Sequence, residues 1–104
     1  MNRVEILTGF LNQDPGDSFS RYALALEYVK AGRPDDARRE FETVLAKDPG
    51  YVATYFQLAQ FYRTIGLKHE AEKTYRAGIV VASKAGDSHT QSELEGALES
   101  LLME

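Results

Sequence analysis

The tripeptide Asp-Pro-Gly occurs at residues 14–16 and again, 34 residues later, at residues 48–50. Shifting the sequence by the same interval superposes further pairs: Leu24 on Leu58, Ala25 on Ala59, Tyr28 on Tyr62, Gly32 on Gly66, Ala37 on Ala71 and Phe41 on Tyr75. A fixed period in this range is typical of stacked structural units, none of which can bury its apolar face alone. The period therefore predicts a short repeat protein, and such stacks usually bind other proteins.

Charge and composition exclude several other classes. The chain has 104 residues, enough for one domain, and a net charge of -4. Arg38-Arg39 is the only adjacent basic pair, so the concentrated basic surface that nucleic acid requires is missing. The absence of cysteine excludes disulfides and cysteine-based zinc sites, and it fits a reducing cytoplasm.

Membrane insertion and secretion are also disfavoured. No apolar run approaches the roughly 20 residues that span a bilayer. Glu5 interrupts the only apolar stretch at the N-terminus, whereas a secretory signal needs a longer uninterrupted run. We therefore predict a cytoplasmic protein with no membrane or nucleic-acid partner.

Short groups of Gly, Pro, Asn and Asp divide the chain into segments of helical length, and none of the segments alternates apolar and polar residues. The predicted helices cover an apolar N-terminal face (Val4, Leu7, Phe10, Leu11), residues 18–30, a segment that begins at Pro34, and residues 52–65, 68–84 and 88–103. Asp17 or Ser18 can cap the second helix, and Ser88 with Gln91 has the capping-box spacing. Gly78 inside a helix costs about 1 kcal/mol relative to alanine, which a close helix crossing would explain.

These residues resemble the tetratricopeptide repeat, whose pattern combines Leu-Gly, Tyr, Ala, Phe and Pro at fixed spacings. The first repeat reads Leu24-Ala25, Tyr28, Gly32, Ala37, Phe41 and Pro49; the second reads Tyr55, Leu58-Ala59, Tyr62, Gly66, Ala71 and Tyr75. The resemblance implies an all-α solenoid of antiparallel helix pairs with about six helices. We expect one domain over residues 1–104, divided into a half unit (1–16), two repeats (17–50 and 51–84) and a capping helix (87–104).

Three positions depart from the family pattern, one of which is Lys47 at a position that is usually apolar. Arg21 stands where the family prefers an aromatic residue, which we expect to weaken the packing of the first repeat. Ser83 replaces the proline that ends the second repeat, so the fifth helix can run further.

The resemblance also implies a binding surface, because the first helix of each repeat in this family lines a concave groove. The predicted peptide-binding residues are Tyr22, Leu26, Phe56, Gln57, Gln60 and Arg63. Aromatic rings would take apolar anchors, amides would bind backbone groups, and the arginine would bind a carboxylate. The alternative interpretation is that the rings pack against a neighbouring helix. The lysines and asparagines of the family's carboxylate clamp are absent, so a chaperone-tail adaptor is not expected.

The leading functional prediction is a non-enzymatic protein-binding module or scaffold that needs no cofactor or metal. One alternative is a homo-oligomerisation unit, such as a homodimer, that uses the terminal helices. Another is an enzyme, but His69 and His89 lack a second histidine at metal-binding spacing. No phosphate-binding loop or Gly-x-Ser-x-Gly elbow is present either. We therefore predict no catalytic residues.

Overall fold

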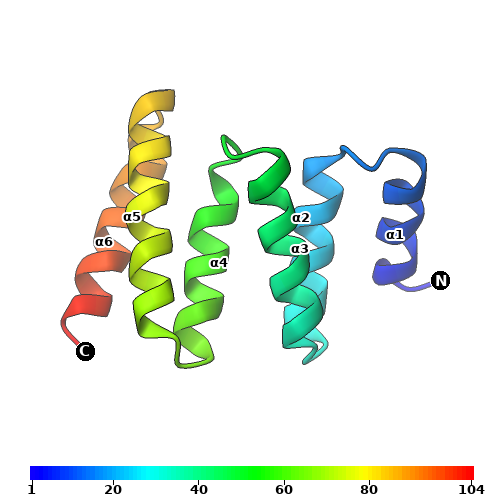
Figure 1. Cartoon of the computed structure of the whole chain (residues 1–104), viewed down its shortest axis with the longest axis horizontal. Coiled ribbons are helices and arrows are strands. Elements are labelled where there is room, and N and C mark those ends of the chain that lie inside the picture. The colour runs from blue at the N-terminus through cyan, green and yellow to red at the C-terminus, as the bar shows by residue number, and fades with distance from the viewer. The chain divides into compact units, whose positions relative to one another are not determined.

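The computed structural model describes all residues 1–104 as six helices without strands, which confirms the all-α prediction (Figure 1). The helices are α1 (Arg3–Gln13), α2 (Ser18–Lys30), α3 (Pro34–Lys47), α4 (Ala53–Thr64), α5 (Lys68–Ala85) and α6 (Ser88–Leu102). The chain forms two compact halves, an N-terminal half (Met1–Tyr51) and a C-terminal half (Val52–Glu104). The division of the chain into repeats and caps stays a prediction.

In the N-terminal half, α2 packs against both α1 and α3. Its two apolar flanks explain this position, because Leu24 and Ala25 are both buried. On α3, Ala37 and Phe41 have no exposed surface at all. A small residue on each of two adjacent helices allows a close approach, and a large residue one turn further on fills the remaining space.

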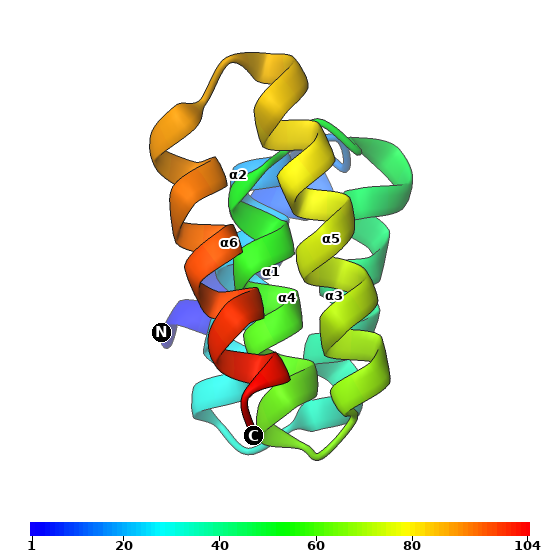
Figure 2. The same cartoon turned by 90° about the vertical axis from the view of Figure 1, so that its left-hand side faces the viewer.

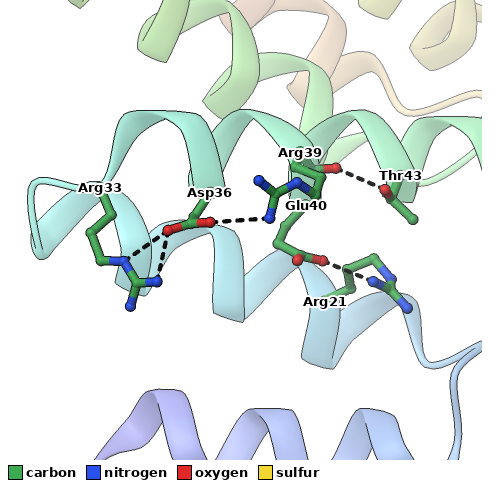
Figure 3. Close-up of polar contacts among 6 residues, drawn as sticks. All are labelled: Arg21, Arg33, Asp36, Arg39, Glu40 and Thr43. Atoms are coloured by element: carbon green, nitrogen blue, oxygen red, sulfur yellow. Dashed lines mark hydrogen bonds and ion pairs between the residues drawn. The ribbon is translucent and has the colours of Figure 1, made fainter.

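Arg21 joins α2 to α3 through an ion pair (Figure 3). Its Nη1 donates a hydrogen bond of 2.8 Å to Glu40 Oε1, and its Nη2 donates one of 3.1 Å to the carbonyl of Pro15. Both side chains of the pair are largely buried. Where the family has an aromatic ring, this chain therefore uses a charge-assisted hydrogen bond between two helices.

In the C-terminal half, α5 packs against both α4 and α6, and α4 also contacts α6 (Figure 2). The largest fully buried side chains here are Tyr75, Leu94 and Leu101. Helix α5 has 18 residues, whereas its counterpart α3 has 14. The extension to Ala85 confirms the expected effect of losing the terminal proline at position 83, because no residue there blocks the next helical hydrogen bond.

Gly78 lies where α5 meets both of its neighbours. A Cβ atom at this position would lie 2.6 Å from the Cβ of Tyr55 on α4 and 3.1 Å from Cδ1 of Leu94 on α6. The close helix crossing predicted from the glycine is therefore present, and the missing side chain allows it.

The helix ends confirm one predicted cap and correct another. Asp17 accepts hydrogen bonds from the backbone N–H and the hydroxyl of Ser20, so it is the N-cap of α2. At α6 the predicted capping box of Ser88 is wrong: Asp87 is the N-cap and binds the N–H and hydroxyl of Thr90 in the same way. In this Asp-x-x-Ser/Thr pattern one carboxylate accepts an orphan backbone N–H of the first turn and the hydroxyl of the same residue.

Helix α4 begins differently from α2 and α6. Its N-cap, Val52, makes no side-chain hydrogen bond. The hydroxyl of Thr54 is fully buried and has no hydrogen-bond partner. The shift of 34 residues places Thr54 on Ser20, but it places Tyr51 on the capping residue Asp17. The aspartate that satisfies the hydroxyl in α2 is therefore missing from α4.

Candidate functional site

The six predicted binding residues all lie on the first helices of the two repeats. Tyr22 and Leu26 lie on α2 in the N-terminal half, and the remaining residues, Phe56, Gln57, Gln60 and Arg63, lie on α4 in the C-terminal half. Each group is described within its own half.

On α2, Tyr22 and Leu26 lie one turn apart and are both half-buried. The ring of Tyr22 contacts that of Tyr51, with centroids 5.6 Å apart and planes tilted by 53°. Burial raises the pKa of the Tyr51 phenol, as do the nearby carboxylates of Asp17 and Asp48. Sequence reasoning missed Tyr51, although it directly follows the repeated Asp-Pro-Gly motif and could have been noticed as an aromatic residue beside a helix start.

On α4, the ring of Phe56 meets that of Tyr75 edge-on, with centroids 6.2 Å apart. Tyr75 belongs to α5, and its hydroxyl donates a hydrogen bond of 2.8 Å to Oε1 of Gln60. Burial raises the pKa of Tyr75, and the neighbouring Arg63 acts in the opposite direction. Phe56 thus takes part in the intramolecular packing that was the alternative interpretation for it, and its side chain is half-buried.

The contact with Tyr75 also orients the side chain of Gln60. Its oxygen faces the phenol, so its amide nitrogen keeps two N–H donors for another acceptor. Gln60 itself is exposed. Gln57 is half-buried, and its side-chain amide makes no hydrogen bond. Both amides therefore retain donors that a peptide backbone can accept.

Arg63 already holds a carboxylate. Its Nε donates a hydrogen bond of 2.6 Å to Oε1 of Glu104, and its Nη2 forms an ion pair with the same oxygen. The Nη2 group also donates to the hydroxyl of Ser100 at 3.1 Å. The hydrogen bond to Glu104 raises the pKa of Arg63 above its ordinary value.

Glu104 has a second basic neighbour, because the ammonium of Lys68 lies 3.4 Å from its main-chain oxygen. Sequence reasoning assigned a carboxylate-binding role to Arg63 but did not find this carboxylate. The two residues are 41 positions apart, and no local pattern connects them.

The two histidines lie at the surface. His89 Nε2 is 3.1 Å from a carboxylate oxygen of Glu93, one turn further along α6, and His69 is exposed. No three His, Cys, Asp or Glu side chains gather in a way that could hold a metal ion. None of the six helices combines the length and the apolar character needed to cross a bilayer.

Comparison with known proteins assigns the family. Residues 22–88, more than half of the chain, match the model of the tetratricopeptide repeat. The chain is 39% identical to a tetratricopeptide repeat domain protein from Salinibacter ruber, over 85% of this chain and 89% of that one, with a TM-score of 0.81. The comparison with curated proteins gives no match.

Two more distant structures share the fold. The first is the TPR2B domain of yeast Sti1 in complex with pHsp70, at 17% identity, 96% and 80% coverage of the two chains and a TM-score of 0.88. The second is PcrH in complex with the chaperone binding region of PopD, at 15% identity, 96% and 76% coverage and a TM-score of 0.87. The repeat pattern, the helix arrangement and these matches agree, and the chain belongs to the tetratricopeptide repeat family.

Proposed function

We propose that this chain is a non-enzymatic protein-interaction module that binds a segment of a partner protein along α2 and α4. It would act as a scaffold, and we place it in the cytoplasm, a setting that a chain without cysteine fits. Two proteins with the same fold are described as complexes, with a region of PopD and with pHsp70, which supports this class of function.

The observation that carries the proposal is the contact between Arg63 and Glu104. The guanidinium of Arg63, on α4, donates a hydrogen bond to the carboxylate of Glu104 in the same chain. The hydroxyl of Ser100 accepts a second hydrogen bond from the same guanidinium. Charge-assisted hydrogen bonds of this kind are exchangeable when the pair is near solvent. We infer that the carboxylate of a partner segment displaces Glu104 and takes its place on Arg63.

The neighbouring side chains suit the rest of such a segment. Half-buried Phe56, which meets Tyr75 edge-on, keeps some exposed surface for an apolar anchor. Gln57 and Gln60, with their remaining N–H donors, suit the backbone carbonyls of an extended peptide. The favoured ligand on this half is therefore a peptide with an apolar residue and a carboxylate.

A peptide library displayed against the immobilised protein tests this proposal. Selected peptides are then titrated against three variants. Arg63→Ala should weaken binding, because the peptide carboxylate loses its partner. Glu104→Gln should strengthen it, because the competing carboxylate is gone. Arg39→Ala, an exposed arginine that pairs with Asp36 on α3, is the matched control and should leave affinity unchanged.

Arg63→Ala and Glu104→Gln should change the affinity in opposite directions, which makes the test specific. General destabilisation would weaken binding in both Arg63→Ala and Glu104→Gln. Equal affinities for Arg63→Ala and Arg39→Ala, or a library that yields no binder, would contradict the proposed site.

A second candidate function is self-association through the terminal helices. It is favoured by large apolar side chains that remain exposed at the two ends of the chain: Ile6 and Phe10 on α1, and Leu102 and Met103 at the end of α6.

A further inference from the structure

Helix α6 has the features of the first helix of a repeat. A shift of 70 residues, two periods plus two residues, superposes it on α2: Asp87 on Asp17, Thr90 on Ser20, Leu94 on Leu24 and Leu98 on Tyr28. The N-cap and its two hydrogen bonds are the same in both helices.

Helix α1 has the features of the second helix of a repeat. It ends in the same Asp-Pro-Gly motif as α3, and the 34-residue shift places Leu7 on Phe41 and Phe10 on Val44. The exposure of the last pair differs sharply, because Phe10 is 50% exposed and Val44 is 1% exposed. Val44 on α3 is thus covered by its neighbours, whereas the equivalent Phe10 on α1 is half-exposed.

The C-terminal half carries an open groove of about 480 Å³ between α5 and α6. Its apolar lining comes from Ile79, Leu98, Leu102 and Met103, and its charged lining from Glu95, Glu99 and Arg76. Arg76 already forms an ion pair with Glu72 on α5. Leu102 is 49% exposed although it belongs to this apolar lining. By the repeat register, a second helix paired with α6 would lie on this side of α6.

Charge supports one particular occupant. Glu95 stands at the position of Ala25 and Ala59, and Arg3 stands at the position of Ala37 and Ala71. In the complete repeats these four alanines are fully buried on paired helices. A helix pair formed by α6 and α1 would therefore place a carboxylate and a guanidinium at the crossing, where the other pairs have two alanines.

We propose that the groove between α5 and α6 binds α1 of a second copy of this chain, so that the two copies share one complete repeat. Phe10 and Ile6 contact the apolar lining, and Arg3, which is 68% exposed and paired with Glu27 in its own chain, reaches Glu95. The contact is head-to-tail, so each copy has one donor helix and one acceptor groove. The inference rests on the second candidate function, self-association through the terminal helices. It uses none of the six predicted peptide-binding residues, so it can fail while the peptide-binding proposal holds.

The test is the mass in solution of two variants, measured separately and mixed, by light scattering over a dilution series. Phe10→Glu blocks the donor helix, and Leu102→Glu blocks the acceptor groove. Both positions are half-exposed, so the fold should tolerate the change, as circular dichroism can verify. Wild type should gain mass with concentration, each variant alone should be monomeric, and an equimolar mixture should form a heterodimer through its one intact contact.

The mixture separates this assembly from other modes of self-association. If α1 bound α1, the Leu102→Glu variant alone would still dimerise, and if α6 bound α6, the Phe10→Glu variant would. Val80→Glu, an exposed apolar position on α5 outside the groove lining, is the matched control and should associate like wild type. Wild type that stays monomeric throughout, or variants that remain monomeric when mixed, would overturn the proposal.

A charge exchange provides a second readout that leaves the apolar residues unchanged. Arg3→Glu alone and Glu95→Arg alone should each weaken association at least several-fold, since each places like charges at the crossing. The chain with both changes should recover the association of wild type. Failure of the double variant to recover would show that these two residues do not meet.

Discussion

Replacing Gly78 with alanine should destabilise the protein, although alanine is the better helix former. In a free helix interior the substitution gains about 1 kcal/mol. In this structure the new Cβ would lie 2.6 Å from the Cβ of Tyr55 and 3.1 Å from both the Cγ of that residue and Cδ1 of Leu94. Carbon atoms pack best at about 3.5–4.0 Å, so α5 and α4 must separate by roughly 1 Å.

The clash at Tyr55 cannot be relieved by a rotamer change. Its Cβ is bonded directly to the main chain of α4, and the side chain is buried. Overpacking of this kind costs typically about 1–3 kcal/mol, and a backbone-anchored contact places Gly78→Ala at the upper end. Subtracting the helix-propensity gain leaves a loss of about 2 kcal/mol, or a fall in Tm of roughly 8–16 °C for a domain of this size.

Gly96→Ala is the matched control, because Gly96 lies inside α6 and a Cβ there meets nothing within 4 Å. It should raise stability by about 0.5–1 kcal/mol. Urea and thermal unfolding followed by circular dichroism give both values. If Gly78→Ala is as stable as wild type or matches the gain of Gly96→Ala, the helices do not cross as closely as described and the steric argument fails.

Four further predictions concern single residues or pH. Thr54→Val should raise stability by about 1 kcal/mol in urea unfolding, because it removes a buried hydroxyl that has no partner. Asp87→Ala should lower the Tm, whereas Ser88→Ala should leave it unchanged. Equal effects of the two substitutions would instead indicate that Ser88 also caps α6. Ala59→Leu should overpack a fully buried site and cost about 1–3 kcal/mol, and an unchanged urea midpoint would contradict the repeat alignment. Asp17 and Asp87 accept hydrogen bonds from hydroxyls, which lower the pKa of both carboxyls in the folded state. Their contribution to stability should therefore be complete above the unfolded pKa of 3.8 and lost as the pH falls through the lower folded pKa. If the Tm of Asp87→Asn falls with acid as steeply as that of wild type, the Asp87 cap does not titrate with folding.

Much of the fold followed from local pattern. The 34-residue period located the helix pairs, and the predicted range 18–30 coincides with α2 as observed. Gly78 was recognisable because a glycine inside a helical pattern needs a packing reason. From the sequence, Arg21 is expected to weaken the packing of the first repeat, because the sequence contains no sign that Glu40 on the next helix lies within hydrogen-bond distance.

The candidate site was less accessible to sequence reasoning. Helical register places Phe56, Gln60 and Arg63 along α4, but it does not say which groups from other helices reach them. Tyr75 and Glu104 do so from 15 and 41 residues away. Such contacts depend on the packing of three helices, and only the folded chain brings them together.

The most direct test of the proposed function is an NMR titration of the isotope-labelled protein with a peptide selected from the library. Binding along the first helices predicts the largest chemical-shift changes on α2 and α4, including the side-chain amides of Gln57 and Gln60, together with release of the contact between Arg63 and Glu104. Changes confined to α3, α5 or the outer face of α6 would contradict the proposal and move the binding surface elsewhere.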